Sequence, residues 1–166
     1  MTKQHFHEKT MSALGSPSYL ARRLLHAFAE HYEALFAPYD ITYQQWTVLM
    51  LLYADMARTS TDMSRQMCHD AGAMTRLVDQ LEKRGFVDRL RDTNDRRIIN
   101  LTLTDSGRAL ADSLKINVLD FLNVALEDFS HEDLATWLRL TARMIEAVDA
   151  RPVGFAEARA KAKAAP

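Results

Sequence analysis

The residues best suited to bind a charged partner are concentrated between Lys83 and Arg97. This segment holds six basic and three acidic residues, a net charge of +3, whereas the whole chain of 166 residues carries 21 basic and 22 acidic residues and a formal net charge of −1. Lysine and arginine bind phosphate oxygens, and arginine also recognises base edges. Because an electrostatic field acts locally, a near-neutral protein with one basic segment can bind nucleic acid. A solvated charged hairpin is the alternative explanation.

No arrangement of residues typical of an enzyme is present in the sequence. The five glycines are widely scattered, and even the closest two, Gly72 and Gly85, are too far apart for a dinucleotide fingerprint or a phosphate-binding loop. His26 and Glu30 have the spacing of two metal ligands on a helix, but a third ligand is not evident, so we expect a surface pair and no metal site. The single cysteine, Cys68, excludes an internal disulfide and is expected to be a small buried residue. We predict neither catalysis nor a cofactor.

Amphipathic helices are expected on both sides of the basic segment. Apolar residues recur at helical spacing over residues 17–38, and again in two helices over residues 104–149. Residues 1–16 show no such periodicity and predict a flexible arm. The stretch 150–166, rich in Ala, Arg and Lys, has no apolar stripe and predicts a disordered tail.

Residues 41–103 have the pattern of three helices followed by a β-hairpin. Thr42 and Gln45 form a capping box ahead of a strongly apolar run. A short polar helix follows over residues 61–68, and a third helix ends at Gly85. The period then changes to alternation on both sides of an Asp-Thr-Asn-Asp turn, which is typical of a hairpin. The predicted fold is therefore mainly α with a small β-hairpin wing, a winged helix-turn-helix lobe.

Three consecutive motifs resemble the MarR (multiple antibiotic resistance regulator) family. They are TRLVDQLEKRGFV at Thr75–Val87, RDTNDRR at Arg91–Arg97, and LTLTxxG at Leu101–Gly107, and they follow one another with only short gaps. The order of helices fits the family from Pro17 to Val148. The resemblance implies a homodimeric transcription regulator that binds double-stranded DNA at a pseudo-palindromic operator, usually a repressor released by a small molecule.

The resemblance also implies which residues contact DNA. Thr75 and Arg76 match the contacts of the recognition helix, which enters the major groove. Arg97 matches the minor-groove arginine at the wing tip, Asp95 matches the acid that orients it, and Arg96 is expected to contact DNA beside them. The helix start, Ala-Gly-Ala-Met, is less polar than the Ser/Thr-rich start common in the family, so specificity is expected to depend on DNA shape or on the wing.

Dimerisation and ligand sensing are implied for the flanking helices. Residues 17–38 and 104–149 correspond to the family's dimerisation helices, and they carry more apolar surface than one winged domain could cover. A family effector pocket lies where these helices meet the DNA-binding lobe, and an aromatic acid or an aryl thioester would suit a cation beside flat rings. Core packing or solvation is the alternative role for the candidate lining residues, which are Arg22, His26, Tyr39, Tyr43 and Trp46.

Two further expectations concern location and the competing function. No apolar run approaches the ~18 residues of a membrane span, and the N-terminus lacks the apolar core of a signal peptide, so we expect a cytoplasmic protein without a membrane partner.

The alternative function is a winged-helix protein-interaction module that does not bind DNA. Such a module would be expected to lack Arg76 or the basic wing, and both are present.

Overall fold

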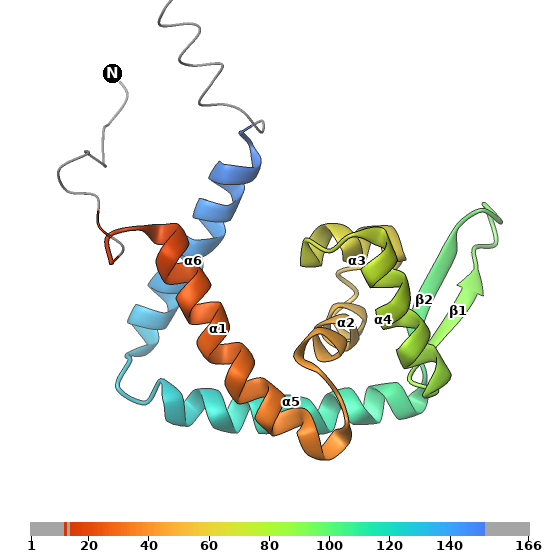
Figure 1. The fold of residues 1–166 in the computed structure, drawn as a ribbon, viewed down its shortest axis with the longest axis horizontal. Coiled ribbons are helices and arrows are strands. Elements are labelled where there is room, and N and C mark those ends of the chain that lie inside the picture. Colours follow the sequence, from red (N-terminus) through yellow and green to blue (C-terminus); the bar gives the residue numbers. More distant parts are fainter. Residues whose placement is uncertain (1–11, 13, 152–166) are drawn as a thin grey trace, which may run out of the picture. The chain divides into compact units, whose positions relative to one another are not determined.

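The computed structural model describes residues 12 and 14–151 (Figure 1). The expected arm at 1–16 and the expected tail at 150–166 therefore lie largely outside the described residues. The elements are α1 (Pro17–Phe36), the 3₁₀ helix η2 (Ala37–Tyr39), α2 (Tyr43–Tyr53), α3 (Ser60–Met67), α4 (Ala71–Lys83), β1 (Val87–Arg91), β2 (Ile99–Leu103), α5 (Asp105–Ala125) and α6 (His131–Asp149).

The helix boundaries follow local capping signals. The Thr42 hydroxyl accepts from the Gln45 amide at 3.2 Å while the Gln45 side chain accepts from the Thr42 amide at 3.0 Å, so the predicted capping box starts α2. The box of Ser130 and Asp133 starts α6 in the same way. Hydrogen bonds from Ser130 also lower the pKa of the Asp133 carboxyl. The mainly helical fold with one two-stranded hairpin is the one predicted.

The chain divides into two compact units whose boundary lies inside α5, between Phe121 and Leu122. The first unit contains the core, in which α2, α4 and the first half of α5 bury their apolar faces. Its largest fully buried side chains are Phe36, Leu49, Met63, Met74, Leu81 and Leu114. The second unit consists of the end of α5 and α6, and the structure records α6 without a buried residue.

The β-hairpin is joined closely to the start of α5. β1 and β2 pair antiparallel with Val87 opposite Leu103 and Arg91 opposite Ile99. Gly85, which follows the end of α4, has φ +73°, a conformation that favours glycine. A Cβ on Gly107 would collide with the Phe86 carbonyl. The first turn of α5 can therefore lie this close to the base of the hairpin only because residue 107 is glycine. The wing is thereby fixed to the helix that follows it.

The expectation for Cys68 is wrong, since its side chain is exposed. The helix predicted over 61–68 spans Ser60–Met67, and Cys68 is its C-cap with left-handed backbone angles of φ 53° and ψ 38°. That conformation turns the chain toward α4 and carries the side chain away from the apolar face of α3.

In the described part of the chain, no helix is both long and apolar enough to cross a membrane.

Candidate nucleic-acid interface

The polar face of α4 is the surface best placed to enter a DNA groove. Met74, Val78 and Leu81 are fully buried on its other side, which leaves Thr75 and Arg76 exposed. The Thr75 hydroxyl donates to the Ala71 carbonyl at 2.8 Å, so its oxygen can still accept a hydrogen bond. Arg76 has no ion-pair partner among the described residues. Its guanidinium donors are therefore available to a partner molecule.

The N-terminus of α4 is held by Asp70. Its carboxylate accepts from the Ala73 amide at 2.9 Å, and this hydrogen bond lowers the pKa of the Asp70 carboxyl, with smaller contributions from Gly72 and the charge of Arg76. Beside Arg76 the surface forms a hollow of about 380 Å³. It is lined by Thr42, Gln44, His69, Ala73, Arg76, Leu77 and Gln80.

Two carboxylates shape the wing tip through its backbone. Asp92 accepts from the amides of Asp95 and Asn94, at 3.1 and 2.8 Å, and from the Asn100 side chain at 2.9 Å. These three hydrogen bonds lower the pKa of Asp92. Asp95 in turn accepts from the backbone amide of Arg97 at 3.0 Å, so its side chain positions the main chain of Arg97. The wing tip is thus a defined turn.

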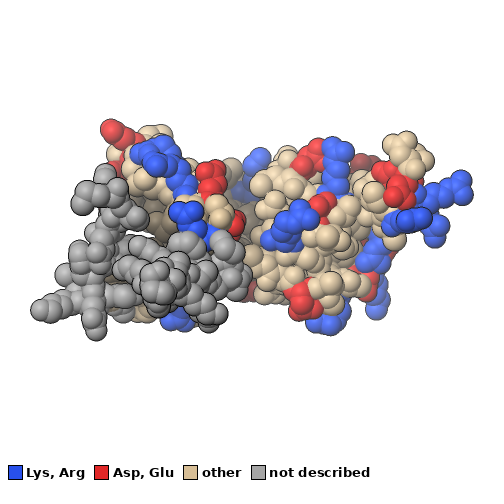
Figure 2. All heavy atoms as spheres, turned by 90° about the horizontal axis from the view of Figure 1, so that it is seen from above, with Lys and Arg blue, Asp and Glu red and all other residues tan. Residues whose placement is uncertain are grey.

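The wing tip presents basic side chains to solvent. Arg96 and Arg97 are both exposed. Figure 2 shows blue side chains gathered at the right, on the side where the hairpin lies in Figure 1. Arg89, in contrast, points back from β1 to α4 and pairs with Asp79 at 2.6 Å and with Glu82 at 2.8 Å. This double ion pair joins the wing to the recognition helix.

Buried and half-buried contacts fix α4 against the preceding helices. Gln45 on α2 is only 6% exposed, and its side-chain amide donates to the Gln80 side chain on α4 at 2.9 Å. At the same end of α4, the C-cap residue Arg84 donates to the carbonyls of Tyr39 and Asp40 and lies over the Phe86 ring at 5.0 Å. The recognition helix is therefore tied to α2 and to the segment that joins α1 and α2.

The five candidate effector residues do not form one cluster. Tyr43 stacks on Tyr32 at 5.5 Å between ring centroids, and Trp46 lies 5.8 Å from the same ring. The Trp46 indole Nε1 is buried and has no hydrogen-bond partner among the described residues. The Tyr39 hydroxyl accepts from Asn117 at 3.2 Å. The aromatic candidates thus gather near the end of α1.

The two other candidates lie earlier on α1 and are exposed. Arg22 is 5.8 Å from the Tyr19 ring, and His26 is 3.6 Å from Glu30. At ~1.5 Å rise per residue, they lie roughly 15 and 9 Å along the helix from Tyr32. The pair of His26 and Glu30 is the surface pair expected from its spacing.

Comparison of the sequence with models of known protein families agrees with this geometry. Residues 41–99, which run from the start of α2 to the first residue of β2, match the model of the MarR family. The winged helix-turn-helix lobe is thus similar to the MarR-family domain.

Relatives and solved structures extend the likeness. The HTH-type transcriptional regulator TtmR of Methylorubrum extorquens is 36% identical over 85 residues, which are 51% of this chain and 44% of that regulator. The chain thus spans less than half the length of this curated relative. A mutant of MarR from E. coli complexed with operator DNA is 28% identical with a TM-score of 0.61, and the match covers 74% of this chain and 91% of that chain. The S. aureus MepR–DNA complex, 22% identical with a TM-score of 0.70 over 82% and 99% of the two chains, has the same fold. MarR-family proteins are transcriptional regulators, which agrees with the expectation that the chain is not an enzyme.

Within residues 41–99, three residues make structural contacts that the sequence did not predict. Asp92 was assigned only to a turn, although an Asp followed by Asn and Asp is the signal of a side chain that caps its own turn. Arg89 on β1 finds its partners on the preceding helix, and Gln45 on α2 finds Gln80 on α4. Such pairings between elements depend on tertiary packing and leave no local pattern.

Proposed function

We propose that the chain is a sequence-specific double-stranded DNA-binding transcriptional regulator. The observation that carries the proposal is the exposed polar face of α4, where Arg76 has no ion-pair partner among the described residues. Ion pairs of Arg89 join this helix to a basic wing. A helix of this kind fits the major groove, where arginine can bind a guanine edge with two hydrogen bonds. Arg96 and Arg97 at the wing tip would reach the flanking minor groove, whose negative potential attracts arginine.

The active species in this proposal is a homodimer formed through residues 17–38 and 104–149. Its support is the apolar surface that these helices leave exposed. On α6, Leu138, Ile145 and Val148 are 57–65% exposed, at positions that share one helix face with Leu134 and Thr141. On α1, Leu20, Leu24 and Leu25 are 39–55% exposed. A second copy of the chain would cover these stripes, and a dyad between two copies matches a pseudo-palindromic operator.

The regulator acts in this proposal as a repressor that an aromatic acid or an aryl thioester releases from DNA. The supporting observation is the ring cluster at Tyr43 and Trp46, where a buried indole N–H has no partner and can donate to an acceptor on a ligand. Of the two basic candidates, Arg22 and His26, the second lies nearer to these rings, roughly 9 Å along α1 from Tyr32, and it would be the one to meet the carboxylate. A ligand can change DNA affinity only by its differential affinity for the two states, and a fivefold to 150-fold release needs ~1–3 kcal/mol.

A mobility-shift titration with the region upstream of the chain's own gene tests the proposal at several salt concentrations. We expect a discrete complex whose affinity falls steeply with salt and exceeds that for a scrambled duplex. Benzoates, hydroxycinnamates and their thioesters are then added to the complex, with Arg22→Ala and His26→Ala as test variants. Equal affinity for both duplexes would contradict specific binding, and the absence of binding to either duplex would favour the protein-interaction module. If no compound releases the DNA, the effector hypothesis alone fails.

A further inference from the structure

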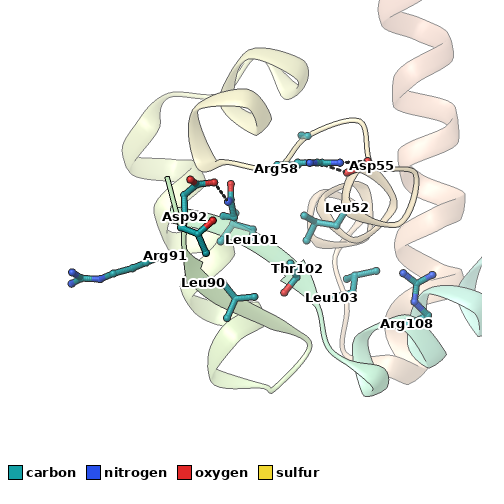
Figure 3. A pocket seen from close by; sticks show the side chains of 13 residues that line it. Leu52, Asp55, Arg58, Leu90, Arg91, Asp92, Leu101, Thr102, Leu103 and Arg108 are labelled. Atoms are coloured by element: carbon teal, nitrogen blue, oxygen red, sulfur yellow. Dashed lines mark hydrogen bonds and ion pairs between the residues drawn. The ribbon is translucent and has the colours of Figure 1, made fainter. Parts of the chain in front are cut away.

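A second concave surface lies at the base of the wing. It has a volume of about 480 Å³, which is within the range of small-molecule sites. Its walls come from α2 and the loop after it, from the hairpin, and from the first turn of α5, all within the first compact unit (Figure 3). The recognition surface of α4 contributes no residue to this lining. The surface is therefore separate from the proposed DNA contacts and from the ring cluster.

One wall of this hollow is apolar although it is open to solvent. The strand register places Leu90 opposite Asn100, so Leu90 and Asn100 share one face of the hairpin with Thr102. Leu90 is 54% exposed there. Leu52 on α2 also lines the hollow. Leu101 and Leu103 line it as well, but by the same alternation they belong to the other face of the hairpin, and Leu101 is only 2% exposed. The exposed Leu90 therefore offers the apolar contact for a ligand.

Among the described residues that line the hollow, Arg108 is a cation that no carboxylate neutralises. Arg58 is already neutralised by two hydrogen bonds to Asp55, at 2.7 and 2.5 Å. Arg91 extends away from the hollow in Figure 3. Arg108 has no ion-pair partner among the described residues and lies 5.1 Å from the centre of the Tyr53 ring. That ring limits the freedom of the Arg108 side chain without neutralising its charge.

The two acidic residues in the lining are occupied by other partners. Asp55 is bound by Arg58, and Asp92 accepts three hydrogen bonds from the wing turn and Asn100. Each therefore has its oxygens directed at protein donors. A ligand that places its carboxylate at Arg108 can therefore direct its apolar end toward the exposed Leu90.

We propose that this hollow binds a small carboxylate with an apolar body, whose carboxylate pairs with Arg108 and whose body packs on Leu90. The binding stands independently of DNA. The consequence for DNA rests on the proposed function: the hairpin joins the loop beside the hollow through the hydrogen bond from the Leu101 amide to the Arg58 carbonyl, at 2.8 Å. A ligand between wing and α2 would bias the position of the wing tip, and with it Arg96 and Arg97.

The direct test is a titration of the DNA-free, full-length protein with 4-phenylbutyrate, followed by amide NMR shifts and by calorimetry. This probe has a carboxylate at one end and a ring at the other. We expect shifts in the wing base and the first turn of α5, and Arg108→Gln should weaken binding by about tenfold. The uncharged 4-phenylbutyramide should bind wild type about as weakly as the carboxylate binds Arg108→Gln.

Lys115→Gln is the matched control, because Lys115 lies over the same Tyr53 ring at 5.2 Å but does not line the hollow. It should bind 4-phenylbutyrate like wild type. Leu90→Asp is a second test variant, since it changes an exposed side chain and should abolish the wing-base shifts. Absence of binding at millimolar concentration, or shifts confined to the surroundings of Tyr43 and Trp46, would overturn the proposal. Because this readout needs no DNA, its failure would leave the proposed regulator function untouched.

Discussion

Arg97 projects from a turn in which its backbone amide donates to the Asp95 carboxylate at 3.0 Å. Arg97→Ala should weaken binding to every DNA sequence, most strongly where A·T-rich flanks narrow the minor groove. It should also reduce the slope of log affinity against log salt by ~1, because one phosphate-proximal charge is lost. Anisotropy titrations over a salt series measure both effects. Unchanged affinity at physiological salt would contradict a DNA contact at this residue.

Asp95 provides a paired control for that experiment. Since Asp95 acts on the backbone of Arg97, Asp95→Ala should lose part of the same affinity by freeing the turn. Asp95→Asn retains a carbonyl oxygen that can accept the Arg97 amide, so it should bind more like wild type. If Asn and Ala at this position were equally harmful, the charge of Asp95 would matter more than its hydrogen bond.

Arg76 is the residue of α4 best suited to read a base. Arg76→Ala should cost ~1–3 kcal/mol in operator affinity if the guanidinium binds a guanine edge. Discrimination should relax at one position in each half-site, which a panel of single-base operator variants detects. A uniform loss over all variants would make Arg76 a phosphate contact and leave base recognition to Thr75 and the wing.

At the scale of the elements, the first turn of α2 couples α1 to the recognition helix. The Tyr43 amide donates to Glu33 on α1 at 3.0 Å, while Gln45 bonds to Gln80 on α4. Gln45→Leu should destabilise the protein by ~1–3 kcal/mol, because it leaves the Thr42 amide and Gln80 without their partner. A double-mutant cycle with Gln80→Ala, measured by urea unfolding, should show a coupling of ~0.5–1.5 kcal/mol. Additive effects would mean that the two side chains are energetically independent.

The wing turn should lose its order in acid. Hydrogen bonds from the backbone of Asp95 and Asn94 and from Asn100 lower the pKa of Asp92 from its ordinary 3.8. A carboxyl with a lowered folded pKa stabilises the fold above its unfolded pKa, and this contribution disappears as pH falls through the folded pKa. We therefore expect the protection of the Asn94 and Asp95 amides, measured as observed exchange relative to the intrinsic rate at each pH, to fall below about pH 4.

Asp92→Ala should show rapid exchange in the wing turn already at neutral pH, because the acceptor of both amides is gone. Asp88→Ala, which removes another exposed carboxylate from β1, is the matched control and should leave the turn protected. Equal protection of the two variants would show that the turn does not need the Asp92 side chain.

Local sequence patterns predicted the helices, their caps and the hairpin. The contacts between elements depend on tertiary packing and could not be predicted from those patterns. The capping boxes at Thr42 and Ser130 and the left-handed Gly85 appear where the sequence indicates, because each depends on residues within one turn. Cys68 was misplaced because its helix ends one residue earlier, in a left-handed conformation that polarity does not signal. The Gln45–Gln80 contact joins two different helices. In the same way, helical spacing alone could not show that Tyr43 and Trp46 of α2 pack on Tyr32 of α1.

At the scale of the whole molecule, the exposed stripe on α6 predicts self-association. Leu138→Asp places a charge on a side chain that is 60% exposed, so it should shift the protein toward monomer without disturbing the core of the first unit. Arg143→Gln, an exposed change outside the stripe, is the control and should remain dimeric. Sedimentation equilibrium at micromolar concentration distinguishes the two. A wild-type monomer that still bound one half-site tightly would contradict the dimeric architecture.

The most direct measurement of the central claim is quantitative footprinting of wild-type protein on the upstream region of its own gene. The account predicts protection of two half-sites whose centres lie about one helical turn, ~10 bp, apart, with two chains bound per duplex. It also predicts that Arg76→Ala relaxes base discrimination at only a few positions of the protected sequence. Protection that spreads evenly along any duplex, or no protection under low-salt conditions, would contradict sequence-specific DNA binding by α4 and the wing.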